Sequence, residues 1–251
     1  MMLKRMIALL LVLFWCNDLI AQNAPPVSRI RYITVKEGMA EEFIEAAGKK
    51  TRRFNSKEGS RRFNTWEIID GPRQGQFVRG QAGTTWSDFD TPPPQKQRDY
   101  WMKNVNTYVK KTGNMQTWAY LPDISYNGRG TTEYGDFARM WFYNINPGMN
   151  ARMIENARKI KKVNEVKKTN ASYGWYRLES GGDRSTWLFA SSVDKWADLE
   201  NATFVSMYEE VHGKGSWADY MNEFSEIVQS SPKARRAEFW RYVREASSPP
   251  R

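Results

Sequence analysis

His212 is the only histidine in the 251-residue sequence, so any imidazole chemistry must use it. With an unperturbed pKa of about 6.5, an imidazole can transfer protons near neutral pH or ligate the iron of a haem. The following Gly213 also fits a plainer role, that of a surface histidine at the end of a helix. One histidine gives little support to a multi-histidine metal centre or a Ser-His-Asp triad, and we predict no metal site.

Glu67 and Arg177 form a second candidate pair, a carboxylate and a guanidinium from distant parts of the chain. Glu67 could act as a general base, and Arg177 could anchor an anionic group through paired hydrogen bonds. This catalytic interpretation requires both side chains to face the same cavity. The alternative is that both are exposed at a sheet edge, where an ion pair contributes little.

Aromatic side chains supply a third candidate site, because Trp175 and Trp187 lie in two neighbouring predicted strands. Indole rings can line a pocket for a flat ligand, or stack on sugars when they are exposed. Large aromatic side chains more commonly fill protein cores, which is the simpler interpretation. The sequence contains no P-loop, dinucleotide fingerprint or nucleophile-elbow motif.

The elements that must hold these residues occur twice in the sequence. When residues 33–89 are aligned without gaps on residues 143–199, 10 of the 57 pairs are identical, including Gly38 with Gly148. Random pairing would give about 3–4 identities. Many of the other pairs keep their apolar or aromatic character, and Glu67 is aligned with Arg177. The sequence therefore indicates a tandem duplication.

Hydrophobic periodicity predicts a β-α-β-β-α-β order in each copy. In the first copy we expect strands over 29–35, 63–69, 76–80 and 117–121, and helices over 39–54 and 97–110. In the second copy the corresponding signals include strands over 173–178, 186–190 and 238–243, and a helix over 217–228.

These elements predict an α+β fold of two tandem ferredoxin-like βαββαβ repeats, over residues 29–126 and 137–246, joined by a linker at 127–136. Such a repeat has two helices on one face of an antiparallel sheet and leaves the other face uncovered. Because side chains alternate along a strand, both faces of each sheet carry apolar residues that need burial. We expect the two open faces to pack together as a barrel with pseudo-twofold symmetry.

This pattern resembles the dimeric α+β barrel superfamily, which includes antibiotic-biosynthesis-monooxygenase-like, stress-responsive A/B-barrel and chlorite-dismutase-like haem proteins. The resemblance covers residues 29–245 and depends on the topology and on two Gly-Met pairs, Gly38-Met39 and Gly148-Met149. It implies a cavity for small apolar or aromatic molecules, and in some members haem binding or oxidation without a metal. Chlorite-dismutase-like members carry a haem-ligating histidine in their second half, but no motif around His212 matches it.

Residues 1–21 have the features of a secretory signal peptide, with Lys4-Arg5 before a short apolar run and Ala21 at the expected cleavage point. The run is about 10–11 residues long, too short to span a bilayer, and no later stretch of the sequence is longer. We therefore predict an exported protein, periplasmic or secreted, with no transmembrane segment after processing. Cys16, the only cysteine, lies within the predicted signal, so the processed chain would have no thiol.

A formal charge of +10 favours anionic partners such as envelope components. Mixed charge signs along the chain, together with export, disfavour nucleic acid. We expect the protein to bind, and in one version to transform, a small hydrophobic or aromatic molecule in a cavity of the tandem barrel. The alternatives are a non-catalytic cell-envelope interaction protein with a basic surface, and a haem-binding protein that uses His212.

Overall fold

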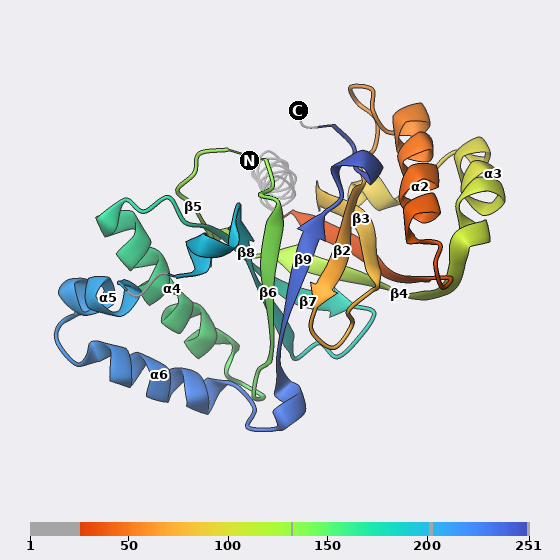
Figure 1. Ribbon diagram of the computed structural model, residues 1–251. Coiled ribbons are helices and arrows are strands. Elements are labelled where there is room, and N and C mark those ends of the chain that lie inside the picture. The colour runs from red at the N-terminus through yellow and green to blue at the C-terminus, as the bar shows by residue number, and fades with distance from the viewer. Residues whose placement is uncertain (1–25, 132, 201–202, 250–251) are drawn as a thin grey trace, which may run out of the picture.

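Eight antiparallel strands form a closed barrel in the computed structural model, which describes residues 26–131, 133–200 and 203–249 (Figure 1). Their order around the barrel is β4-β1-β3-β2-β9-β6-β8-β7, and pairing of β4 with β7 closes it. The barrel strands are β1 (Val27–Val35), β2 (Asn64–Asp70), β3 (Phe77–Thr84), β4 (Val109–Tyr120), β6 (Phe137–Asn144), β7 (Ser172–Ser180), β8 (Thr186–Val193) and β9 (Arg235–Tyr242). The predicted α+β barrel is confirmed.

The two halves of the barrel use the same strand order, β4-β1-β3-β2 in the first and β9-β6-β8-β7 in the second. Their registers also agree, because Arg79 lies opposite Thr65 in the first half, and Phe189 lies opposite Trp175 in the second. In the sequence alignment of the two copies, the same residues correspond, Phe189 to Arg79 and Trp175 to Thr65. Pairing of β2 with β9 and of β4 with β7 joins the halves.

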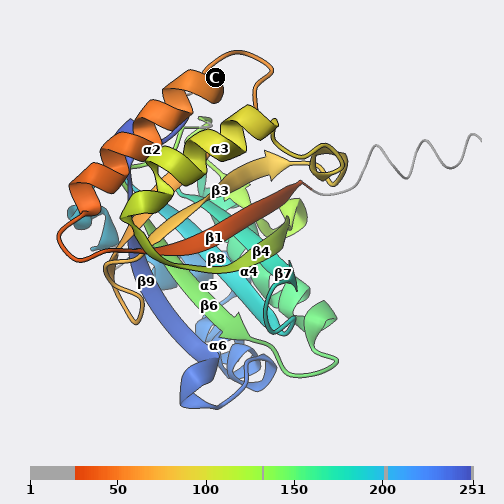
Figure 2. The same cartoon turned by 90° about the vertical axis from the view of Figure 1, so that its right-hand side faces the viewer.

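Helices cover the outside of the barrel on two opposite sides (Figure 1). The first half carries α2 (Ala40–Phe54) and α3 (Gln95–Asn104), which Figure 2 shows in front of the first-half strands. The second half carries α4 (Asn150–Lys167), α5 (Phe204–His212) and α6 (Ser216–Ile227). Gly38 precedes α2 with a φ of 71°, a left-handed conformation that favours glycine, so the first Gly-Met pair has a local structural reason.

Side chains fill the barrel lumen. Alternate residues of each strand point inward, and they form one apolar cluster. Its buried members are Tyr32, Ile68, Val78, Trp118, Ala138, Met140, Phe142, Leu178, Leu188 and Trp240. Because this cluster occupies the middle of the barrel, a ligand site has to lie at an end of the barrel or between the sheet and the helices.

The outer faces of the strands pack against the helices in separate clusters. In the first half, Phe43 and Ala47 of α2 pack on Ile33 and Phe77. In the second half, α4 and α6 cover a larger cluster that includes Trp175, Trp187 and Phe224. The apolar spacing along each helix therefore marks the face that contacts the sheet.

A buried ion pair lies toward the end of the barrel where the β2–β3 hairpin turns. Glu238 is 1% exposed and accepts two hydrogen bonds from Arg73, at 2.7 Å and 2.9 Å. It also accepts one from the Trp240 indole N–H at 2.8 Å. Gly71 in the hairpin has a φ of 104°, and a Cβ there would lie 2.7 Å from the carbonyl oxygen of Ala237. The hairpin thus requires glycine for both its conformation and its close packing.

The structure corrects two sequence-based boundaries. The helix predicted over 97–110 ends at Asn104, and β4 begins at Val109 instead of residue 117. Residues 110–116 are mostly exposed and polar, so they lack the alternation that marks a strand, although they pair with β1. The predicted linker at 127–136 overlaps β5 (Tyr126–Asn127), a short strand that pairs with β7.

The predicted signal peptide, residues 1–21, lies outside the described residues. Within the described part of the chain, no helix is both long enough and apolar enough to cross a membrane.

Candidate functional site

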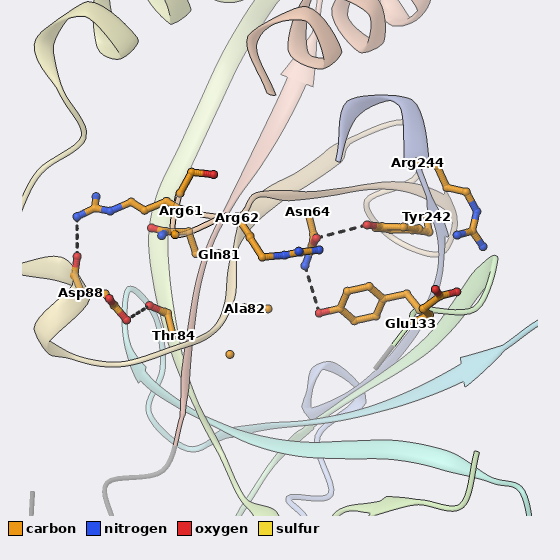
Figure 3. A pocket seen from close by; sticks show the side chains of 14 residues that line it. Arg61, Arg62, Asn64, Gln81, Ala82, Thr84, Asp88, Glu133, Tyr242 and Arg244 are labelled. Carbon is orange, nitrogen blue, oxygen red and sulfur yellow. Dashed lines mark hydrogen bonds between the residues drawn. The ribbon is translucent and has the colours of Figure 1, made fainter. Parts of the chain in front are cut away.

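A hollow of about 450 Å³ opens at the end of the barrel opposite the β2–β3 hairpin (Figure 3). It lies where β2 begins and where β3 and β9 end, so it forms the mouth of the barrel. We call it the mouth hollow. Its lining residues are Gly59, Ser60, Arg61, Arg62, Asn64, Gln81, Ala82, Gly83, Thr84, Asp88, Glu133, Tyr134, Tyr242 and Arg244.

Aromatic rings lie at the base of the mouth hollow. Trp66 lies 5.2 Å from Tyr134 and 4.7 Å from Tyr242, measured between ring centroids, and the two tyrosines are 5.3 Å apart. Asn64 links both phenols, donating to the Tyr134 hydroxyl at 3.2 Å and accepting from the Tyr242 hydroxyl at 3.4 Å. Tyr134 is 38% exposed, so its ring remains accessible to a molecule in the hollow. The base is therefore suited to an aromatic ligand.

The arginines of the hollow differ in how they are engaged. Arg61 donates to the backbone carbonyl oxygen of Asp88 at 2.7 Å, and Arg244 forms a 2.7 Å ion pair with Asp136. Arg62 is half-buried and has no hydrogen bond or ion pair to any described residue. Figure 3 shows its side chain directed toward the part of the hollow where Asn64 lies. Arg62 is thus a cation available to a ligand.

Asp88 adds an ionised carboxylate on the opposite wall of the hollow. It accepts hydrogen bonds from the hydroxyl of Thr84 and from both the backbone N–H and the hydroxyl of Thr85. These bonds lower the pKa of Asp88 to about 2, and the bond from the Thr84 hydroxyl has the largest effect. Asp88 therefore stays charged at neutral pH and cannot act there as a general acid.

The structure does not bring Glu67 and Arg177 together. Each lies on its strand between two lumen residues, so each points to the outside of the barrel. Glu67 forms an ion pair with Arg241 on the neighbouring strand β9, and Arg177 pairs with Glu179 at 2.8 Å. The catalytic interpretation required both side chains to face the barrel lumen, and that part of the prediction is wrong. Their placement matches the alternative of ion pairs on the outer face of the sheet.

Trp175 and Trp187 lie together, but in the layer between the second-half sheet and its helices. Their ring centroids are 6.4 Å apart, and both side chains are buried in the cluster under α4 and α6. This matches the core-packing interpretation. Neither indole N–H has a hydrogen-bond partner among the described residues. A ligand role for the two rings stays a prediction.

His212 ends α5 immediately before Gly213, as the plainer interpretation predicted. Its Nε2 lies 3.0 Å from the backbone carbonyl oxygen of Lys159 on α4, and its ring packs 4.5 Å from that of the buried Tyr208. Because a carbonyl oxygen accepts, Nε2 carries the hydrogen and is not free for a metal. Haem ligation by His212 stays a prediction.

No group of three or more His, Cys, Asp or Glu side chains is placed to hold a metal ion in the described part of the chain.

Comparison with solved structures finds this architecture in proteins of low sequence identity. A candidate monooxygenase from Lactobacillus acidophilus NCFM is 12% identical, with a TM-score of 0.57, over 87% of this chain and 94% of that chain. An anthrone oxidase-like protein is 7% identical, with a TM-score of 0.52, over 88% and 93%. Chlorite dismutase from Candidatus Nitrospira defluvii, solved in complex with imidazole, is 9% identical, with a TM-score of 0.52, over 89% and 94%.

The chain shares with these proteins the fold of an eight-stranded antiparallel α+β barrel. At these identities the likeness shows the fold alone, since one fold supports many activities. No protein-family model and no curated protein matches the sequence.

None of the site residues predicted from the sequence lines the mouth hollow. The Arg61-Arg62 doublet, placed just before a predicted strand, was the one local signal that could have drawn attention to it. The aromatic base gave no such signal, because Tyr134 and Tyr242 come from segments that are far apart in the chain. Only closure of the barrel places those segments side by side.

Proposed function

We propose that this protein binds a small aromatic acid in the mouth hollow. The observation that carries the proposal is Arg62, a half-buried guanidinium without a partner among the described residues, in a hollow with an aromatic base. A guanidinium binds a carboxylate through two parallel hydrogen bonds, and stacked rings contact the planar part of such a ligand. The proposal narrows the expected ligand from any small hydrophobic or aromatic molecule to one with an acidic group.

The dimensions of the site agree with a ligand of one or two rings. A volume of about 450 Å³ lies within the range of small-molecule sites. The candidate monooxygenase and the anthrone oxidase-like protein that share the fold are named for activities compatible with an aromatic ligand. We propose binding alone, since the described residues that line the hollow include no histidine or cysteine, and Asp88 stays ionised at neutral pH.

Isothermal titration calorimetry with 2-naphthoate and its uncharged analogue 2-naphthamide tests the proposal. We expect 2-naphthoate to bind more tightly, because only the acid can pair with Arg62. The variant Arg62→Met should weaken 2-naphthoate binding by about tenfold or more, because two charge-assisted hydrogen bonds are lost, and leave 2-naphthamide binding unchanged.

Arg184→Met is the matched control. Its side chain is 75% exposed in the turn before β8, away from the hollow, so the variant should bind both compounds as the wild type does. Equal affinity of the wild type for acid and amide, or no loss in Arg62→Met, would contradict the proposal. The proposal would also be contradicted if the wild type bound neither compound.

We also propose that the protein is exported and that its two halves arose by tandem duplication. Residues 1–21 support export through their basic start, short apolar run and small residue at position 21. The 10 identities among 57 aligned pairs support duplication, and so does the common register of the two halves. Under this proposal the barrel has a pseudo-twofold axis that relates two ferredoxin-like repeats.

A further inference from the structure

The aromatic base of the mouth hollow contains a short chain of oriented hydrogen bonds. The side-chain amide of Asn64 lies between two phenols, with its oxygen facing Tyr242 and its NH2 group facing Tyr134. The Tyr242 hydroxyl donates to the Asn64 oxygen, and the Asn64 nitrogen donates to the Tyr134 oxygen; Figure 3 shows both bonds as dashed lines from Asn64. The chain therefore runs from Tyr242 through Asn64 and ends on the Tyr134 hydroxyl.

The direction of this chain leaves the hydroxyl hydrogen of Tyr134 available. An amide oxygen only accepts and an amide NH2 group only donates, so the phenol that faces the NH2 group must accept with its oxygen. A phenol that accepts in this way keeps its own O–H hydrogen for another acceptor. No described residue accepts that hydrogen from Tyr134, whereas the Tyr242 hydrogen is already donated to Asn64.

Tyr134 keeps its hydroxyl hydrogen at neutral pH. Removal of water by the surrounding side chains raises the pKa of the phenol, and the neighbouring Tyr242 raises it further. The charge of Arg62 and the hydrogen bond from Asn64 lower the pKa, but their combined effect is smaller. Tyr134 is therefore a neutral hydrogen-bond donor under ordinary conditions.

Arg62 and Tyr134 face the same part of the hollow. Both residues line it, and the charge of Arg62 is near enough to the phenol to lower the pKa of Tyr134. Figure 3 shows the Arg62 side chain directed toward Asn64, which bonds to the Tyr134 hydroxyl. Because Tyr134 is 38% exposed and Arg62 has no hydrogen bond or ion pair to a described residue, both groups can contact a ligand in this space.

The second half of the barrel does not repeat the amide between the phenols. In the alignment of the two copies Asn64 corresponds to Gly174, and the two residues have the same register, opposite Gly80 and Ala190. A Cβ at Gly174 would lie 2.8 Å from the ring of Tyr176, so that ring occupies the place of a side chain at this position. Since the barrel forms without an amide there, the contrast favours a role for Asn64 in the hollow.

We propose that the Tyr134 hydroxyl donates a hydrogen bond to a carbonyl or carboxylate oxygen of the ligand, beside Arg62. This inference rests on the proposed function, since it concerns a ligand of the mouth hollow. In a carboxylate, both oxygens can pair with Arg62 while one of them also accepts from Tyr134, because each oxygen has two lone pairs. Uncharged aromatic ketones bind through Tyr134 alone, so the ligand class is that of aromatic carbonyl compounds. Tyr134 is then a specificity-determining residue.

Equilibrium dialysis with 2-naphthoate, 2-acetylnaphthalene and 2-methylnaphthalene tests the inference. The three compounds have the same rings and carry a charged oxygen acceptor, a neutral one and none. Tyr134→Phe keeps the ring of the side chain and removes the donor. We expect it to weaken binding of 2-naphthoate by about tenfold or more and of 2-acetylnaphthalene by about threefold, since hydrogen bonds to charged groups are stronger. Binding of 2-methylnaphthalene should not change.

Two comparison variants remove other tyrosine hydroxyls. Tyr126→Phe is the matched control, because Tyr126 does not line the hollow and donates to the Thr169 carbonyl oxygen at 3.0 Å; it should bind all three compounds as the wild type does. Tyr242→Phe removes the first hydroxyl of the chain, whose hydrogen goes to Asn64. It should weaken 2-naphthoate binding by less than Tyr134→Phe does.

Unchanged affinity of Tyr134→Phe for 2-naphthoate and 2-acetylnaphthalene would overturn the inference. An equal loss for 2-methylnaphthalene would do so as well, because the ring itself would then be packed differently, and a larger loss in Tyr242→Phe would identify Tyr242 as the donor instead. Failure of the proposed function has another signature, equal wild-type affinity for 2-naphthoate and 2-naphthamide with no loss in Arg62→Met. In that case weaker binding of 2-acetylnaphthalene by Tyr134→Phe would still support Tyr134 as the donor.

Discussion

Replacing Lys50 by Met should make the protein more stable at neutral pH and remove a pH dependence from its stability. Lys50 is 4% exposed between α2 and the first-half sheet, and it has no acidic partner among the described residues. Burial lowers the pKa of Lys50 from 10.5 to about 7. In the unfolded chain the pKa of a lysine is about 10.4.

The sign follows from the number of protons bound in each state. Between pH 7 and about pH 10 the unfolded chain binds a proton at Lys50 that the folded chain does not, so stability rises with pH. Each pH unit is worth about 1.4 kcal/mol, so the cost of burying the lysine is about 5 kcal/mol well below pH 7 and about 4 kcal/mol at pH 7, where the folded lysine is half protonated. The lost hydrogen bond to Asn55 offsets about 1 kcal/mol of the gain. Lys50→Met should therefore be more stable by about 3 kcal/mol at pH 7 and by less than about 1 kcal/mol at pH 9.5.

Equilibrium urea unfolding, followed by tryptophan fluorescence at pH 7, 8, 9 and 9.5 in chloride buffers, measures this difference. Buried tyrosines also respond to high pH, but the comparison between variant and wild type at each pH removes their contribution. Lys49→Met should follow the pH dependence of the wild type, because Lys49 is exposed and pairs with Glu45 on the helix surface.

Parallel stability curves for Lys50→Met and the wild type between pH 7 and pH 9.5 would refute the reasoning. They would mean that Lys50 keeps its proton in the folded protein, with a solvent path or a counter-charge that the packing beneath α2 does not show. A less stable Lys50→Met at pH 7 would refute it equally, because the hydrogen bond to Asn55 would then outweigh the burial of the charge.

Two further predictions concern the β2–β3 hairpin and the N-terminus. Gly71→Ala should destabilise the protein by about 3 kcal/mol or more, because the added Cβ would contact the Ala237 carbonyl oxygen and the backbone φ is positive. Gly75→Ala is the control, since its φ is also positive but no atom lies near its Cβ, and it should destabilise the protein by about 1 kcal/mol. Equal losses of stability of the two variants in urea unfolding would contradict this prediction. The intact mass of protein recovered from outside the cytoplasm should correspond to a chain that starts at Gln22, and a chain that retains residues 1–21 would refute cleavage.

Local pattern was sufficient for most of the architecture. The alternation around Trp66 and Ile68 is visible in the sequence, because successive side chains of a strand point to opposite faces and the lumen residues therefore recur at every second position. The alignment of the two copies anticipated that Arg79 and Phe189 would occupy matching places in two sheets. The pattern failed for the start of β4, where the strand is paired through its backbone while its side chains are polar and exposed.

The candidate sites could not be obtained in the same way, because each depends on contacts between distant segments. Asn64 and Tyr242, which meet at the mouth hollow, are 178 residues apart. Glu67 and Arg177 occupy equivalent positions in the two halves, yet both point outward, and each pairs with a different neighbour. A sequence shows which residues are equivalent, but not which face of a strand meets the lumen.

The sequence by itself indicated most of the order of strands and helices, because this order depends on short-range periodicity, and it listed the residue types available for chemistry. The tertiary structure decided which ionisable groups are buried and what surrounds them. Lys50 looks like any other helix lysine beside Lys49, and only the packing of α2 on β3 places it next to Arg79 and away from water. Burial and proximity are properties of the closed barrel, and they set the charge and the binding capacity of these side chains.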